Sequence, residues 1–146
     1  MKFPARRRLG VIFSLLPLLA FPIMGEEPSA GLTAEEAAAA VLKHIRTQTA
    51  KHGSFWVYDS VADKSLSLQL EEMHPERFGL LGDLTYFASA KFKDPAGNPV
   101  MVDIVMRGPD ADDLELLEVT VQERDGQERY AWQHDGGVWK RSGEGA

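Results

Sequence analysis

The chain of 146 residues contains no cysteine. A disulfide, a thiolate nucleophile, a cysteine metal site and a lipid attached to cysteine are therefore all excluded. The sequence also has no Gly-Lys-Ser phosphate loop, no HExxH helix and no Gly-x-Ser-x-Gly elbow. These absences give no reason to expect a cofactor. A domain of about 110 residues can be stable from its hydrophobic core alone.

Only one long hydrophobic run occurs, and it lies at the N-terminus. Four basic residues precede an apolar run from Leu9 to Met24, and the small residue Gly25 follows. This order is typical of a secretory signal peptide. The run is shorter than the roughly 20 residues of a membrane-spanning helix, and two prolines interrupt it. We therefore predict a cleaved signal peptide over residues 1–25, a flexible leader over 26–32, and a periplasmic or secreted protein with no stable membrane span after cleavage.

Basic residues are scarce once this segment is removed. The whole chain carries a formal charge of −6, and residues 1–25 hold four basic and no acidic residues, so the remainder carries −10. A protein this acidic would approach phosphates against its own electrostatic field. Nucleic acid and anionic membrane surfaces are therefore poor candidates for partners. An envelope protein or a small apolar ligand is the expected kind of partner.

Residues 33–53 carry the signals of one amphipathic helix. Thr33 and Glu36 have the spacing of a capping box, and Gly53 can supply the left-handed stop. Apolar residues recur at helical spacing between them and form one stripe. The members of this stripe are Ala34, Ala37, Ala38, Val41, Leu42 and Ile45.

After Gly53 the apolar pattern changes to a period of two, which predicts strands. The clearest segments are "FWVYD", "SLSLQLEE", "TYFASAKFK", "PVMVDIVM" and "LELLEVTVQERDG", separated by turn sequences such as "KDPAGNP" and "RGPDADD". We predict an α+β fold, with one N-terminal amphipathic helix packed on a curved antiparallel sheet of about five or six strands. The single domain spans residues 33–141, and residues 142–146 form a disordered tail.

A family resemblance rests on "FWVYDSVADKSLSLQL", "MHPERF", "GDLTYFASAKFKDPAGNP" and "YAWQHDGGVWK". With these strings the chain resembles small exported bacterial proteins of unassigned function, and its element order is similar to cystatin-like and NTF2-like modules. The resemblance implies a helix embraced by a meander of strands. The chain lacks the Gln-x-Val-x-Gly hairpin by which cystatins inhibit proteases, and it shows only one of the several helices that close NTF2-like pockets.

Three residues are candidates for acid/base catalysis. His74 lies in "EEMHPERF" among carboxylates that can raise its pKa, although Pro75 indicates a turn there. Asp103 interrupts an apolar strand, and Tyr58 has the parity of the same sheet face. A cross-strand ion pair of Asp103 with Lys91 or Lys93 is the structural alternative, which we favour.

The stretch "GPDADDLE" offers four carboxylates as possible metal ligands, Asp110, Asp112, Asp113 and Glu115. A calcium loop also needs a glycine at its sharp turn and a distant bidentate glutamate. Neither is in place, so a solvated acidic loop is the expected structure and no metal site is predicted.

The opening strand raises the main functional question, because its aromatic residues point to both faces. By parity Phe55 and Val57 face the helix, while Trp56 and Tyr58 lie on the outer face with Phe87 and Asp103. These last four residues are the predicted binding surface. Alternatively, the C-terminal "YAWQHDGGVWK" folds over that face, with Trp132 or Trp139 covering Trp56.

The sequence favours an exported, non-catalytic binding or protein-interaction module of the cell envelope. Two alternatives stay open. One is a small acid/base enzyme or hydrolase of the envelope that uses His74, Asp103 or Tyr58, which would have to converge in a cleft. The other is a secreted protein inhibitor that acts through hairpin tips such as "DPAGNP".

Overall fold

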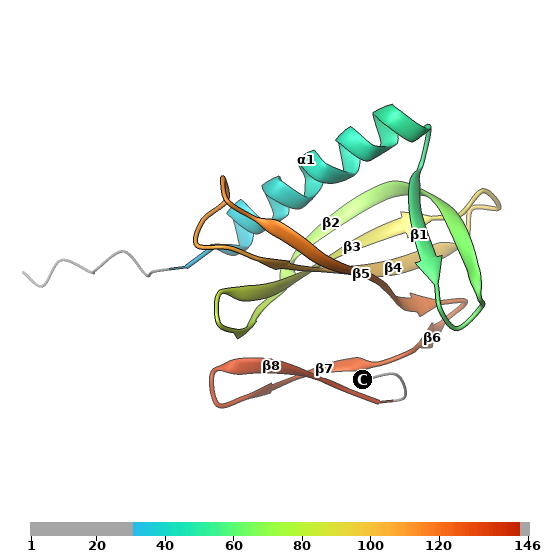
Figure 1. Ribbon diagram of the computed structural model, residues 1–146. Coiled ribbons are helices and arrows are strands. Elements are labelled where there is room, and N and C mark those ends of the chain that lie inside the picture. Colours follow the sequence, from blue (N-terminus) through green and yellow to red (C-terminus); the bar gives the residue numbers. More distant parts are fainter. Residues whose placement is uncertain (1–30, 144–146) are drawn as a thin grey trace, which may run out of the picture.

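The computed structural model describes residues 31–143 (Figure 1). The predicted signal peptide and most of the predicted leader lie outside the described residues. Leu32 was assigned to that leader, and this assignment is wrong. Its side chain is buried in the core, and its N–H donates a hydrogen bond of 3.2 Å to the Tyr86 hydroxyl. The domain therefore begins before the helix cap.

The predicted helix is confirmed as α1, Ala34–His52. The Glu36 N–H donates to the Thr33 hydroxyl at 3.2 Å, and the Thr33 N–H donates to the Glu36 carboxylate at 2.9 Å. These two bonds satisfy N–H groups that have no partner inside the helix. Gly53 ends the helix with a φ of 79°, a left-handed conformation that glycine adopts without strain.

The fold class is also confirmed as α+β, with one helix on a six-stranded antiparallel sheet that is not closed. The strands follow the order of the sequence: β1 (Phe55–Asp59), β2 (Lys64–Gly82), β3 (Thr85–Lys93), β4 (Pro99–Arg107), β5 (Glu115–Arg124) and β6 (Gln127–Glu128). A separate hairpin follows, formed by β7 (Ala131–Asp135) and β8 (Val138–Ser142). Ser142, which the sequence analysis places in the tail, pairs with Ala131 and belongs to the domain. Helix α1 lies on one face of the sheet and the hairpin on the opposite face, so the molecule has three layers (Figure 1).

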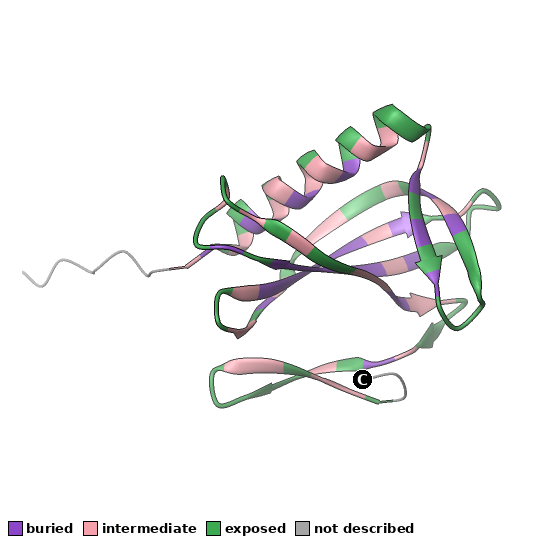
Figure 2. Ribbon diagram, in the orientation of Figure 1, coloured by how far each residue is buried: buried purple, intermediate pink, exposed green. Residues whose placement is uncertain are grey.

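The main core lies between α1 and the sheet (Figure 2). Strands contribute alternate residues to it, as the period of two predicts. In β1, Phe55 and Val57 are buried while Trp56 and Tyr58 are exposed. The Phe55 ring stacks on Phe92 with centroids 5.3 Å apart. Burying a side chain of this size stabilises the fold by about 1.5–3 kcal/mol.

Strand β2 is longer than the sequence pattern indicates. A turn was predicted at Pro75, but the chain continues as one strand of 19 residues through that position. The prediction is wrong because a β-bulge accommodates the proline: the register with β3 shifts between the pairs of His74 and Phe78. Proline cannot donate a ladder hydrogen bond, so an interruption of the ladder is where a strand tolerates it.

No helix within residues 31–143 combines the length and the apolar character that are needed to span a bilayer.

Candidate functional site

The exposed face of β1 forms the first candidate site. Trp56 is 55% exposed and Tyr58 57% exposed, and Val61 in the following turn is 71% exposed. We call these three residues the β1 patch. Strand β1 is the last strand at one edge of the sheet, and among the strands within residues 31–143 it pairs with β2 alone. The sequence prediction that Trp56 and Tyr58 lie on the outer face is confirmed.

The β1 patch rests on a turn that is held in place by hydrogen bonds. The Tyr58 hydroxyl donates to the carboxylate of Asp63, at the far end of the turn. This hydrogen bond raises the pKa of Tyr58, with smaller contributions from burial and from the Asp59 charge, so the hydroxyl stays neutral at physiological pH. The N–H groups of Val61 and Ala62 each donate to Asp59 at 3.1 Å. The patch is therefore a shaped surface and not a loose loop.

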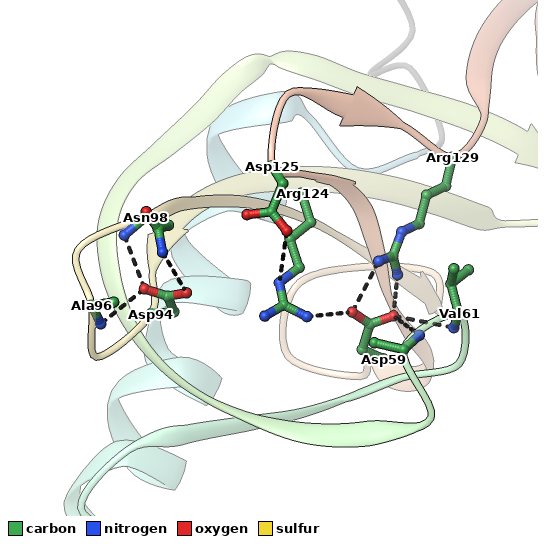
Figure 3. Close-up of polar contacts among 9 residues, drawn as sticks. Asp59, Val61, Asp94, Ala96, Asn98, Arg124, Asp125 and Arg129 are labelled. Atoms are coloured by element: carbon green, nitrogen blue, oxygen red, sulfur yellow. Dashed lines mark hydrogen bonds and ion pairs between the residues drawn. The ribbon is translucent and has the colours of Figure 1, made fainter.

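Asp59 itself is a buried ionic anchor that the sequence analysis missed (Figure 3). Its carboxylate accepts two hydrogen bonds from Arg129, one of them at 2.9 Å, and one from Arg124 Nη1 at 3.1 Å. Burial alone would raise the pKa of Asp59, but the hydrogen bonds from Arg129, Ala62 and Arg124 outweigh it and hold the pKa far below its usual range. We call this cluster of Asp59, Arg124 and Arg129 the ionic clasp, because it ties β1 to the far end of β5.

The predicted binding surface does not extend across the sheet. Phe87 and Asp103, assigned to the same surface as Trp56, are fully buried. The β7–β8 hairpin covers them, and Trp132 stacks on Phe87 with centroids 4.0 Å apart. The alternative prediction, that the C-terminal segment covers this face, is thus correct for Phe87 and wrong for Trp56, which stays exposed.

Asp103 is the polar centre beneath the hairpin. Its carboxylate accepts hydrogen bonds from the Ser89 hydroxyl, from the Tyr130 hydroxyl at 2.8 Å and from Trp132 Nε1 at 2.7 Å. The predicted pairing with Lys91 or Lys93 is wrong, since Lys91 pairs with Glu71 at 3.2 Å.

The surroundings of Asp103 keep one of its donors protonated. Burial raises the pKa of Tyr130, and the adjoining Asp103 charge raises it further. The phenol therefore donates its hydrogen bond over the whole physiological pH range. Arg141 lies over the rings of Tyr130 and Trp132, at 4.6 and 5.1 Å from their centroids, and contributes cation–π attraction. Through its hydrogen bonds with Tyr130 and Trp132, Asp103 on β4 holds the hairpin against the sheet.

The three catalytic candidates do not converge. His74 on β2 contacts Glu76, with Nδ1 2.5 Å from Oε1, and Asp103 lies two strands away, beyond Ser89. Tyr58 is on the edge strand and is bonded to Asp63. Within residues 31–143 no hydrogen bond joins any two of the three. Each has a structural partner of its own, which leaves the acid/base alternative without geometric support.

In the acidic loop between β4 and β5, the carboxylate of Asp110 accepts hydrogen bonds from the backbone of the loop itself. Asp110 accepts hydrogen bonds from the N–H groups of Asp112 and Asp113 at 3.0 and 3.1 Å. Across residues 31–143 no group of three or more histidine or acidic side chains is placed to hold a metal ion.

We therefore expect this loop, Asp110 to Glu115, to bind calcium no more tightly than about millimolar, as weak extracellular sites do. Isothermal titration calorimetry of the purified protein with CaCl2 measures this directly. The Asp112→Asn variant is the control, because it removes one possible ligand and leaves the Asp110 backbone bonds in place. Micromolar binding that is lost in Asp112→Asn would contradict the expectation.

The chain was also compared with known proteins. No protein-family model, no curated protein and no solved structure matches it. The resemblance to cystatin-like and NTF2-like modules therefore stays a prediction, and the function has to be argued from the geometry of the chain's own surfaces.

Proposed function

We propose that the protein is an exported, non-catalytic binding module of the cell envelope that binds a protein partner through the β1 patch. The observation that carries the proposal is that Trp56 and Tyr58 are both more than half exposed on one face of an edge strand. Support for export comes from the sequence pattern of residues 1–25.

Single exposed apolar side chains are common on protein surfaces, but several that are grouped together often mark an interaction surface. Tryptophan and tyrosine dominate the binding energy of protein interfaces because they bury much apolar area and lose little conformational entropy. In the β1 patch, the strand beneath the two rings is fixed by Phe55 and Val57 in the core and by Asp59 in the ionic clasp. A surface held this firmly needs little ordering when a partner binds, which favours affinity.

The Trp56→Ala variant tests this proposal. Because Trp56 is 55% exposed, we expect the free energy of unfolding to change by no more than about 0.5 kcal/mol. Loss of a central aromatic anchor should weaken partner binding by about 2 kcal/mol or more, which is roughly 30-fold. The matched control is Leu117→Ala, which removes another exposed apolar side chain, 42% exposed on β5.

The partner can be captured with a photo-crosslinking amino acid at position 58 in the expressing cell. We expect a specific adduct, identified by mass spectrometry, whose yield falls in Trp56→Ala and is unchanged in Leu117→Ala. An adduct that forms equally in both variants, or a loss of several kcal/mol of stability in Trp56→Ala, would show that the β1 patch is not the binding surface.

A further inference from the structure

A pocket of about 250 Å³ lies between the β7–β8 hairpin and the sheet, on the face opposite α1. It contains none of the β1 patch. We call it the hairpin pocket. Its lining residues come from β2, β3, β5, β6, β7 and β8, and those used below are Arg77, Phe87, Gln122, Glu128, Trp132 and Trp139.

Aromatic rings form one wall of the hairpin pocket. Trp132 lies parallel to Phe87, and Trp139 meets the Phe87 ring edge-on with centroids 5.9 Å apart. Trp139 packs directly on the backbone of Gly79, where a Cβ atom would overlap its indole ring. Both indoles are nevertheless only half-buried, so parts of their surfaces remain open. The wall is thus preformed and apolar.

A hydrogen-bond acceptor without a partner belongs to the same pocket. Gln122 is fully buried, and its Nε2 donates to the Tyr130 carbonyl at 2.8 Å. Its Oε1 is buried and accepts no hydrogen bond from any residue within 31–143. A buried acceptor without a hydrogen bond lowers the stability of the folded protein by roughly 1–3 kcal/mol unless a donor reaches it. A ligand with a hydroxyl group can supply that donor.

The pocket lining carries charges of both signs, the guanidinium of Arg77 and the carboxylates of Glu76 and Glu128. Glu76 also lines it but is engaged by His74. The side chains of Arg77 and Glu128 form no ion pair or hydrogen bond within residues 31–143, which leaves one positive and one negative side chain of the pocket lining available to a ligand. A charged ligand would be attracted by one of these side chains and repelled by the other. A neutral ligand with both donors and acceptors can bond to both.

We propose that the hairpin pocket binds one ring of a neutral sugar. A sugar ring has an apolar face of C–H groups that fits a tryptophan wall, and hydroxyl groups that both donate and accept. The hydroxyls can donate to Gln122 and Glu128 and accept from Arg77. The pocket is slightly smaller than the roughly 300 Å³ at which drug-sized ligand sites begin, which suits a single ring. This site is separate from the proposed function at the β1 patch.

The three tryptophans of the chain make the test internally controlled. In ¹H–¹⁵N spectra of the purified protein, each indole N–H gives one signal. On titration with the methyl glycosides of glucose and N-acetylglucosamine, at least one should shift the signals of Trp132 and Trp139 in a saturable way, with a Kd of about 1 mM. The Trp56 signal should not move. Sorbitol, which has the hydroxyls of glucose but no ring, should shift none of the three.

Rim variants test the assigned contacts. Arg77→Gln and Glu128→Gln should each weaken binding about five-fold, the effect of one hydrogen bond. Trp56→Ala should bind the sugar like the wild type, which separates this proposal from that of the β1 patch. Absence of a saturable shift, equal shifts of all three indoles, equal shifts with sorbitol, or unchanged affinity in both rim variants would each overturn the proposal.

Discussion

Asp59→Ala should lower the free energy of unfolding by about 3–5 kcal/mol, because it removes the carboxylate of a buried ion pair and leaves the charges of Arg124 and Arg129 without a partner there. The Asp59 carboxylate is fully buried, and the side chains of Arg124 and Arg129 are only 14% and 17% exposed. Removal of the carboxylate also frees the N–H groups of Val61 and Ala62. Urea denaturation at neutral pH measures the loss. Asp125→Ala is the matched control, since Asp125 also lies near Arg124, at 3.9 Å, but is 69% exposed.

The same ionic clasp predicts how stability depends on pH. The folded-state pKa of Asp59 lies below its unfolded value of about 3.9. Its contribution is therefore fully present above about pH 5, and it is lost as the pH falls from about 4 toward the folded-state pKa. The stability difference between wild type and Asp59→Ala should shrink over that acidic range. A difference that is small at neutral pH, or constant down to about pH 2, would mean that the clasp contributes little.

Asp103→Ala should release the β7–β8 hairpin from the sheet and cost about 3 kcal/mol or more. Three donors would lose their acceptor together, the buried hydroxyls of Ser89 and Tyr130 and the part-buried indole N–H of Trp132. Each unsatisfied buried group costs about 1–3 kcal/mol, although the costs of one network do not simply add. Asp103→Asn keeps the shape and one acceptor oxygen, so it should lose less than the alanine variant.

The location of the damage separates this prediction from general destabilisation. Hydrogen exchange of the hairpin amides should accelerate in Asp103→Ala, and the indole N–H signal of Trp132 in ¹H–¹⁵N spectra should shift. Amides of β3 and β4 should exchange no faster than the drop in global stability requires. A hairpin that keeps its protection in this variant would show that aromatic stacking on Phe87 fastens it, and that Asp103 does not.

The sequence alone determined α1 and the inward face of the first strands. The capping box of Thr33 and Glu36, the stop at Gly53 and the alternation through Phe55 and Val57 are local features. Each is expressed within a few residues, so it could be predicted without knowing the rest of the fold. Asp59 continues the buried parity of Phe55 and Val57, and a carboxylate in that position was a signal that an ion pair would be found.

The partners of that carboxylate were beyond prediction, because Arg124 and Arg129 lie 65 and 70 residues away along the chain. The bulge that carries β2 through Pro75 was missed for a related reason. A local rule says that proline interrupts a ladder, but the pairing with β3 decides whether the strand ends or bulges there.

The tertiary structure also decided which residues of the outer sheet face are covered and which stay exposed. Trp56 and Phe87 have the same parity, and the sequence pattern treats them alike. Phe87 lies on β3 inside the sheet, where the hairpin docks and Trp132 covers it, while Trp56 lies on the edge strand beyond the hairpin's reach. Periodicity records which side of a strand a residue occupies. Which segment packs against that side depends on long-range contacts. Here the β7–β8 hairpin packs over Phe87 and forms the hairpin pocket, and it does not cover the β1 patch.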